Sequence, residues 1–285
     1  MSATTSTKKP WAVFTIVRDE SFYLPKWYAY YSQFLADVDI HIIHHVPKEK
    51  ATTAAAAAKR DTCCDFLVGK ECQIYVEDHE FFSSGWIRDI VKHYQARLLK
   101  QYEAVIFTDV DEIISIHPDS GFVGLGEFMT HFVQDKKHTN WRVNAYSLIH
   151  LPDLGEPSID LARPILAQRM YWFRDDYFDK PLISKIPLNY VLGHHTATNM
   201  AKERNPHIYM IHLHQFDFDW YVRRHQRWAK DYKVSEEDKQ ATFNSHYRQK
   251  DFDKLVFQYY HYIFTQTRIV PTLVERWVRD RLQGI

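Results

Sequence analysis

Two kinds of segment alternate along the first 110 residues of the chain. Short apolar, β-branched runs of the kind found in buried strands occupy residues 11–17, 38–44, 73–76 and 104–108. Between them, apolar positions at helical spacing predict one helix over residues 24–35 and another over 87–102. Strands that alternate with helices form mainly parallel sheets with helices on both faces. The first half therefore predicts an α/β fold of this kind.

The second half of the chain is less regular. Residues 141–149, 181–186 and 208–213 have the composition of strands. Helical spacing begins at residue 217 and returns over 252–264 and 272–282, which predicts a helical C-terminal region. No internal repeat and no Gly/Ser linker separates the halves. We expect residues 11–112 and 113–285 to be two parts of one compact unit.

Composition and charge exclude several classes of protein. The 285 residues are 45% hydrophobic, which excludes a wholly disordered chain, and 36 Lys plus Arg balance 36 Asp plus Glu. Without surplus positive charge, we expect no binding to nucleic acid. The N-terminus has no signal-peptide core, and no stretch approaches the roughly 20 apolar residues of a transmembrane helix. We therefore expect a cytoplasmic protein without a transmembrane segment.

We assign no chemical role to the three cysteines or to the alanine-rich segment. Cys63, Cys64 and Cys72 form neither an even disulfide set nor a CxxC pair, which fits a reducing compartment, and we interpret them as core or loop residues. Five alanines at 54–58 have high helix propensity but no apolar stripe. We expect a short surface helix or a mobile loop there.

Three acidic residues follow the apolar run that ends at residue 108. Asp109, Asp111 and Glu112 lie beyond the carboxyl end of a predicted strand, where open parallel sheets bind their ligands. Alternate residues of an extended chain point to the same side, so Asp109 and Asp111 can share a hard divalent cation. A turn rich in Asp is the plain alternative. After so apolar a strand, we favour a metal site.

Two unrelated functions use a DxD motif after an apolar strand. Phosphatases of the haloacid dehalogenase type resemble this arrangement, but their motif ends the first strand of the domain and is followed by a different pattern from the Ile113 found here. Nucleotide-sugar glycosyltransferases of GT-A type instead place DxD after a nucleotide-binding α/β half. The layout favours the glycosyltransferase, and a phosphatase is the second alternative.

Four ordered blocks extend this resemblance. Two segments resemble those of glycosyltransferase family 2 and the related family 92: TIVRDESFYLPKWYAYYSQF and SSGWIRDIVKHYQARLLKQYEAVIFTDVDEII. Two later blocks of the same proteins resemble KPLISKIPLNYVLGHH and IHLHQFDFDWYVRRH. The acidic "ED" pair that supplies a base in many family 2 enzymes is not recognisable. A non-catalytic sugar- or nucleotide-binding protein on the same fold is therefore the first alternative.

The resemblance implies a fold, an activity and a cofactor. The fold is GT-A-like, with residues 11–112 as the donor-binding half and 113–285 as the acceptor-binding half. The activity is transfer of a sugar, with inversion, from a nucleoside diphosphate sugar to a hydroxyl of a glycan or other acceptor. The cofactor is a divalent cation, Mn²⁺ or Mg²⁺.

Two histidines on a later strand extend the predicted metal site. His212 and His214 alternate along the strand at 208–213 and so share a face. Imidazole beside carboxylate suits Mn²⁺ or another first-row cation. His212 ranks first because it aligns with the leading His of the resembling block, where a late His commonly completes a GT-A metal site. The predicted ligands are Asp109, Asp111 and His212, and two structural histidines are the alternative.

The ends of predicted strands and helices supply a donor-binding set. It comprises Thr15, Val17, Arg18, Glu20, Gly85, Arg88, Asp109 and Lys180. Gly85 and Arg88 begin the strongest helix, and a helix N-terminus beside an arginine suits an anionic diphosphate. At these positions, helix capping by Asp19 and solvated side chains are the alternatives.

The catalytic base is assigned to His195, which follows Gly193 in the third block. An imidazole can accept a proton near neutral pH. His194, Asp176 and Asp179 compete for this role. Asp217 competes as well, although we expect it to cap the helix that begins there.

Overall fold

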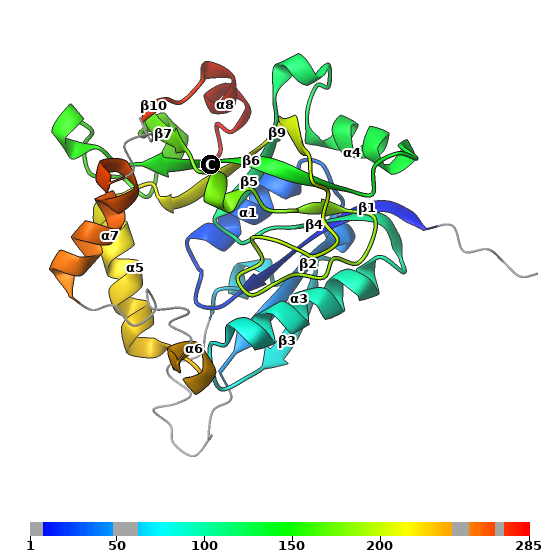
Figure 1. The fold of residues 1–285 in the computed structure, drawn as a ribbon, viewed down its shortest axis with the longest axis horizontal. Coiled ribbons are helices and arrows are strands. Elements are labelled where there is room, and N and C mark those ends of the chain that lie inside the picture. The colour runs from blue at the N-terminus through cyan, green and yellow to red at the C-terminus, as the bar shows by residue number, and fades with distance from the viewer. Residues whose placement is uncertain (1–7, 48–61, 241–250, 266–270) are drawn as a thin grey trace, which may run out of the picture.

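The computed structural model describes residues 8–47, 62–240, 251–265 and 271–285. Its strands form one curled sheet with helices on both faces (Figure 1). The strands of the main path, in spatial order, are β10 (Thr272–Leu273), β7 (Tyr171–Arg174), β6 (Asn140–Ile149), β8 (Ile183–Ser184), β4 (Tyr102–Phe107), β1 (Lys9–Val17), β2 (Ile40–Val46) and β3 (Gln73–Asp78). Off this path, β9 (Arg204–Gln215) pairs with both β6 and β5 (Glu112–Ile116). The expected α/β class, a GT-A-like and Rossmann-like sheet flanked by helices, is confirmed.

The first half forms the parallel part of the sheet. Its strands are β1 (Lys9–Val17), β2 (Ile40–Val46), β3 (Gln73–Asp78) and β4 (Tyr102–Phe107). They pair in parallel in the order β4-β1-β2-β3, so their carboxyl ends lie at one edge. On β1, Phe14 packs in one core cluster and Val13 in another. Burial on both faces is what an unbroken apolar run predicts.

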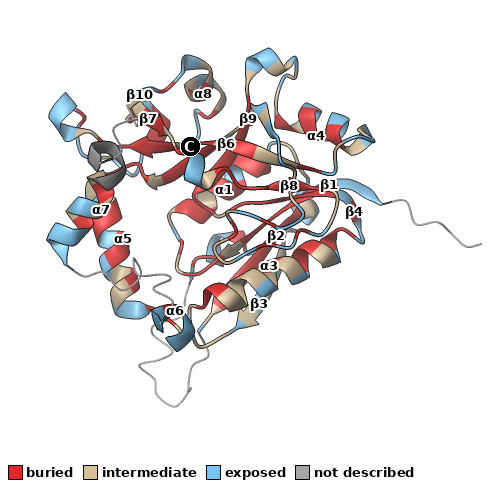
Figure 2. Cartoon of the chain, in the orientation of Figure 1, coloured by how far each residue is buried: buried red, intermediate tan, exposed pale blue. Residues whose placement is uncertain are grey.

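Helices cover both faces of this parallel part. α3 (Ser84–Leu98) packs Val91 and Leu98 against Phe14, while α1 (Tyr23–Tyr31) and α4 (Leu125–Gln134) belong to the core cluster of the opposite face. Figure 2 shows buried residues along the inner sides of α3 and α4 and exposed residues along their outer sides. The two predicted helices are confirmed, but both are shorter than expected: α1 ends at Tyr31 and not at residue 35, and α3 ends before residue 102 because β4 begins there. α4 was not predicted.

The second half adds mostly antiparallel pairs. Its strands are β5 (Glu112–Ile116), β6 (Asn140–Ile149), β7 (Tyr171–Arg174), β8 (Ile183–Ser184), β9 (Arg204–Gln215) and β10 (Thr272–Leu273). β6 and β9 confirm two predicted strands and pair in parallel, whereas β5 runs antiparallel to β9. The strand predicted over 181–186 is reduced to β8. β5 and β7 were not predicted from the sequence.

Helices dominate the C-terminal region, as predicted. They are α5 (Phe218–Asp231), α6 (Glu236–Gln240), α7 (Phe252–Thr265) and α8 (Arg276–Arg281). α5 and α7 pack together through Tyr221 and Tyr259. The helix predicted over 272–282 is wrong in its first residues, because Thr272 pairs with Trp172 of β7 before α8 begins.

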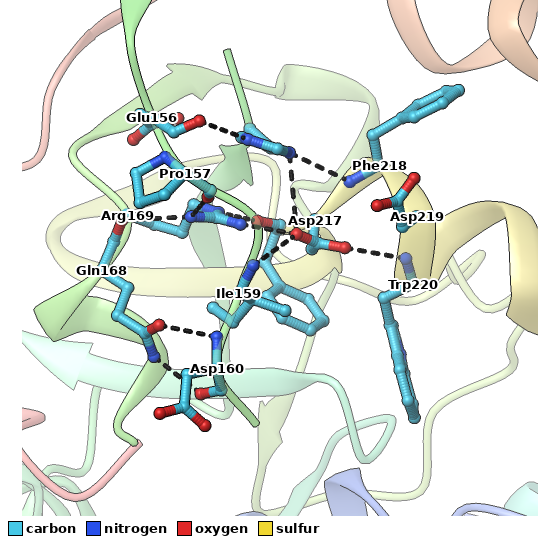
Figure 3. A network of polar contacts seen from close by, with 12 residues as sticks. Glu156, Pro157, Ile159, Asp160, Gln168, Arg169, Asp217, Phe218, Asp219 and Trp220 are labelled. Atoms are coloured by element: carbon cyan, nitrogen blue, oxygen red, sulfur yellow. Dashed lines mark hydrogen bonds and ion pairs between the residues drawn. The ribbon is translucent and has the colours of Figure 1, made fainter. Parts of the chain in front are cut away.

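A buried ion pair anchors the start of α5 (Figure 3). Asp217 caps the helix by accepting a hydrogen bond from the Trp220 amide at 2.8 Å, and its other carboxylate oxygen lies 2.6 Å from Arg169 Nη2. The guanidinium of Arg169 also donates to the carbonyls of Phe216 and Pro157. These contacts fix the direction in which α5 leaves the sheet, and they confirm the expected capping role of Asp217.

The described residues test three of the sequence-based expectations only in part. Within the described residues, no helix is both long and apolar enough to cross a membrane. The alanine run at 54–58 lies outside the described residues. The two halves of the chain share one sheet because β4 pairs with β8, while their donor-binding and acceptor-binding roles stay a prediction.

Candidate functional site

A cavity of about 710 Å³ lies at the carboxyl ends of β1 and β4. Elements distant in sequence converge on it. Its polar lining from the first half includes Arg18, Glu20, Asp109 and Asp111, and from the second half Asp175, Lys180, His195, His212, His214 and Arg224. This is the place where open parallel sheets bind their ligands. Most of the predicted site residues therefore meet in one cavity.

Lys180 neutralises the acidic end of β4. Its Nζ lies 2.8 Å from Asp109 Oδ2 and 2.5 Å from Glu112 Oε1. Burial raises the pKa of Glu112 to about 7, even beside this cation. Burial acts against the charge of Lys180, but the two carboxylates outweigh it and raise the pKa of the ammonium. Lys180 is thus a fixed positive charge next to the DxD motif.

Arg224 of α5 holds the second carboxylate of the motif. Its Nη1 lies 2.7 Å from Asp111 Oδ2, and its Nη2 lies 2.9 Å from Glu20 Oε1. Burial alone would raise the pKa of Asp111, but Arg224 and the neighbouring histidines hold it well below its usual range. Asp111 is therefore ionised at neutral pH, as metal ligation requires.

Asp111, His212 and His214 form a group that fits a divalent cation. One donor atom from each side chain lies within 4.8 Å of the others. Burial lowers the pKa of His212 to about 3 and also lowers that of His214, so both imidazoles are neutral and can offer a lone pair. One carboxylate and two imidazoles are an acceptable set for Mn²⁺ or another first-row cation.

Asp109 is not part of this group of described donor atoms, and its Oδ2 accepts a hydrogen bond from Lys180 Nζ at 2.8 Å. The structure brings Asp111 and His212 together, and their role as metal ligands stays a prediction. His214, ranked second from the sequence, lies equally well placed. The prediction that Asp109 is a ligand remains untested by this arrangement.

Three of the aspartates considered for the catalytic base are either held in ion pairs or lie outside the described cavity lining. Asp179 is engaged by Arg174 and Arg204 and accepts from the Ala145 amide, and Asp217 belongs to the α5 anchor. Asp176 is exposed and does not line the cavity within the described residues. These three carboxylates are therefore poor candidates for the base.

Three groups that face the cavity remain as base candidates. Burial lowers the pKa of both His194 and His195 to about 4. His195 Nδ1 lies 2.9 Å from the Tyr177 carbonyl, which leaves its Nε2 for a ligand. Burial raises the pKa of Asp175 to about 6, although it accepts a hydrogen bond from Ser147 Oγ at 2.8 Å. The pKa of Asp175 is therefore closer to neutral pH than the pKa of either histidine.

The predicted donor-binding residues fall into two groups. Val17, Arg18, Glu20, Asp109 and Lys180 line the cavity. The structure does not bring the other three, Thr15, Gly85 and Arg88, into its described lining.

Each residue of the second group has another place. Thr15 is fully buried within β1, and Arg88 pairs with Asp89 at 2.8 Å. At the N-terminus of α3 the Ser84 amide donates to the Asp238 carboxylate at 2.8 Å. The Asp238 carboxylate of α6 therefore binds the N-terminus of α3, where we had expected the donor's diphosphate.

Sequence reasoning missed two charged residues of the described cavity lining. Arg224 lies on α5, 113 positions from Asp111, and only its place in the RRH block pointed to it. Asp175 was overlooked among four aspartates between positions 175 and 217 that carry no distinguishing spacing. Its burial beside Ser147 is a tertiary property that no local pattern reveals.

The histidine pair gives a direct prediction about the metal. We expect His212→Ala to weaken nucleoside diphosphate binding in Mn²⁺ by at least about tenfold, and metal-free binding far less, because a lost ligand costs more than the ~10-fold lost with an outer partner. His214→Ala should also weaken nucleoside diphosphate binding more in Mn²⁺ than without metal. Calorimetry with and without Mn²⁺ measures both. His207→Ala, on β9 but outside the described lining, is the control. Equal losses in both conditions would make His212 a structural residue.

Comparison with known proteins gives only distant likenesses. No family model matches the chain, and no curated protein matches it. The S. aureus TarS 1–349 structure has a TM-score of 0.31 and 13% identity, covering 92% of this chain and 74% of that one. Its complex with UDP gives 0.31 and 12%, with the same coverage.

A second likeness is to core-mannan synthase A from Aspergillus fumigatus in its Mn/GDP form. It has a TM-score of 0.24 and 11% identity, covering 52% of this chain and 44% of that one. Both proteins are glycosyltransferases. TM-scores of this size support no inference about activity, so function must be inferred from the cavity.

Proposed function

We propose that this chain is a metal-dependent glycosyltransferase that moves a sugar from a nucleoside diphosphate sugar to an acceptor hydroxyl, with inversion. One observation carries the proposal. A carboxylate and two neutral imidazoles, from Asp111, His212 and His214, meet inside a cavity at the carboxyl edge of the parallel strands. When bound there, Mn²⁺ or Mg²⁺ would offset the negative charge that develops on a departing diphosphate.

Arg18 supports an anionic donor. It is only 7% exposed, lines the cavity and stacks on Tyr232, with the guanidinium carbon 4.3 Å from the ring centroid. Its Nε and Nη1 donate no hydrogen bond to any described residue. Buried donors are normally satisfied, and a guanidinium binds phosphate oxygens with charge-assisted hydrogen bonds. We therefore assign Arg18 to the donor's diphosphate, with Lys180 as a second positive charge.

Asp175 is our choice of base in preference to His195. The acceptor hydroxyl transfers its proton to the Asp175 carboxylate as its oxygen bonds to the anomeric carbon. The bond from that carbon to the diphosphate oxygen breaks, and its electron pair leaves with the diphosphate. A base is most effective when its pKa lies near the working pH, and Asp175, with a pKa raised to about 6, meets this condition better than His195 at about 4.

This assignment predicts a defined pH profile. We expect Asp175→Asn to lower kcat by ~10²- to 10⁴-fold with a small change in KM, because a general base acts in the transition state. In the unsubstituted protein, kcat/KM should fall as the pH drops through about 6, where the carboxylate gains its proton. Initial rates over pH 4.5 to 8 measure both effects.

Two further variants make this test specific. Asp176→Asn changes the exposed neighbour and should retain activity. His195→Gln should retain the acid limb near pH 6. Activity lost in His195→Gln and kept in Asp175→Asn would return the base to His195.

A thermal-shift screen tests the proposed activity at the level of binding. A ligand that binds only the folded state raises the free energy of unfolding by RT ln(1 + c/Kd), where c is the free ligand concentration, and so raises the unfolding temperature. We expect at least one nucleoside diphosphate to do so in Mn²⁺ and to do so less after Mn²⁺ is chelated. Hydrolysis of a simple phosphate monoester, without any nucleotide effect, would instead support the phosphatase alternative.

A further inference from the structure

A second group of metal-binding side chains lies outside the cavity. His44 is near the end of β2, and Cys63 and Cys64 precede the short helical turn Asp65–Leu67. All three side chains are buried, at 8%, 2% and 9% exposure. One donor atom from each lies within 4.8 Å of the others. None of the three is in the described lining of the cavity.

We propose that His44, Cys63 and Cys64 bind a Zn²⁺ ion at a second metal site. Thiolate and imidazole are the ligands that Zn²⁺ takes in structural sites, whereas Mn²⁺ and Mg²⁺ prefer carboxylate oxygens. The cavity offers one oxygen and two nitrogen ligands, while this group offers two sulfurs and one nitrogen. The two thiolates therefore distinguish this site from the cavity group.

The spacing of the two thiols agrees with this ligand role. Cys63 Sγ and Cys64 Sγ are 3.8 Å apart. Two sulfurs bound at ~2.3 Å to one tetrahedral Zn²⁺ lie ~3.8 Å from each other, so both thiols can reach one ion without moving apart. Neither cysteine is in a disulfide.

The direction of His44 separates this site from the cavity. Successive residues of a strand point to opposite faces. His45 points to the α3 face, where its ring centroid lies 4.5 Å from that of Trp86, and it lines the cavity. His44 points to the other face, where Ile42 and the two cysteines belong to one core cluster. The second site therefore lies on the other face of the sheet from the cavity, and its proposal does not depend on the proposed glycosyl transfer.

Binding at this site would join β2 to the turn that precedes β3. Zn²⁺ binding displaces the thiol protons, so the two cysteines would bind as thiolates and release two protons. Three protein ligands leave a fourth position for water or another group. A metal bound only by the folded chain raises its stability. We therefore expect Zn²⁺ to raise the unfolding temperature even when the cavity site is disabled.

Cobalt substitution tests the site through its thiolates. The full chain is stripped of metal with a chelator, kept reduced, and titrated with Co²⁺. A sulfur ligand gives a near-ultraviolet thiolate-to-Co²⁺ charge-transfer band, which the oxygen and nitrogen ligands of the cavity do not give. We expect the band to saturate at one Co²⁺ per chain and to disappear when Zn²⁺ is added.

Matched variants decide which residues bind. The near-isosteric Cys63→Ser and Cys64→Ser should each weaken or abolish the band, and His44→Ala should weaken Co²⁺ binding by about tenfold or more, since even outer partners are worth ~10-fold. Cys72→Ser, which changes the remaining cysteine, should keep the band, as should Asp111→Asn. Near-ultraviolet circular dichroism confirms that each variant is folded.

Three outcomes would overturn the proposal. One is that the unsubstituted chain gives no thiolate band. Another is that the band persists in folded Cys63→Ser and Cys64→Ser proteins. The third is that it vanishes with Cys72→Ser.

Discussion

Asp111→Asn is expected to abolish sugar transfer while leaving the fold intact. The substitution removes the charge of the carboxylate that the two histidines face, so a cation would lose its anionic ligand. A Lewis acid contributes several kcal/mol of charge stabilisation, and its loss should lower kcat by ~10³-fold or more. Arg224 keeps its contact with Glu20 at 2.9 Å, so the packing of α5 should survive.

The measurement is the initial rate of nucleoside diphosphate release in Mn²⁺, with thermal unfolding as the check on the fold. Asp78→Asn is the matched control, because Asp78 also ends a parallel strand but is exposed and does not line the described cavity. It should leave the rate unchanged. Normal activity in a folded Asp111→Asn protein would remove the metal assignment.

Lys180→Met is expected to have the largest effect on stability. Lys180 and Glu112 are almost fully buried, with side chains 3% and 1% exposed. Removing one partner of a buried ion pair leaves the other charge uncompensated, which costs about 3 to 5 kcal/mol. Asp109 contributes less, because its side chain is 39% exposed and can be solvated. Urea unfolding at pH 7 measures the loss.

The pH dependence of this loss has a definite sign. Burial already raises the pKa of Glu112 to about 7, and without Lys180 it would rise further. A carboxyl with a raised folded pKa binds its proton in the folded state, so its stabilising contribution is present at low pH and is lost as the pH rises through that pKa. The deficit of Lys180→Met should therefore be smaller at pH 5 than at pH 8.

A double variant separates the charge effect from lost packing. Glu112→Gln combined with Lys180→Met removes both members of the pair, so it should recover part of the lost free energy of unfolding. Lys202→Met, at an exposed position, should change stability little. A double variant no more stable than Lys180→Met would show that the lost packing of the Lys180 stem, and not an uncompensated charge, accounts for the deficit.

The sequence predicted the half of the fold whose signals are local. The run at 11–17 is continuous because β1 is buried on both faces, and the stripe over 87–102 is regular because one side of α3 covers the sheet. β5 could not be recognised, because Glu112 begins that strand directly after the acidic turn and reads as part of the motif. β8 keeps only two residues, since its partners β4 and β6 set the length of the ladder.

The candidate site was predictable only where a motif marked it. Asp109 and Asp111 follow an apolar strand, so their place at the sheet edge follows from the topology. The cations that hold them come from far along the chain, with Lys180 71 positions from Asp109 and Arg224 113 positions from Asp111. Such pairings depend on how the second half folds over the first, and no local spacing encodes them.

The cysteines illustrate the same limit. From spacing alone, Cys63 and Cys64 read as core or loop residues, because a metal pair is usually recognised as CxxC. The third residue of the group, His44, lies within an apolar strand, and nothing in that strand's pattern marks it as a metal ligand. Only the packing of the turn at Asp65–Leu67 against β2 brings the three side chains together.

Release of nucleoside diphosphate from a panel of nucleoside diphosphate sugars tests the proposed activity most directly. The purified chain is incubated with each donor and simple hydroxyl acceptors, with Mn²⁺ or with a chelator. Turnover of at least one donor is expected in Mn²⁺, with loss on chelation and in Asp111→Asn. Saturable donor binding in Mn²⁺ with no release from any donor would contradict glycosyl transfer and leave a binding protein on this fold.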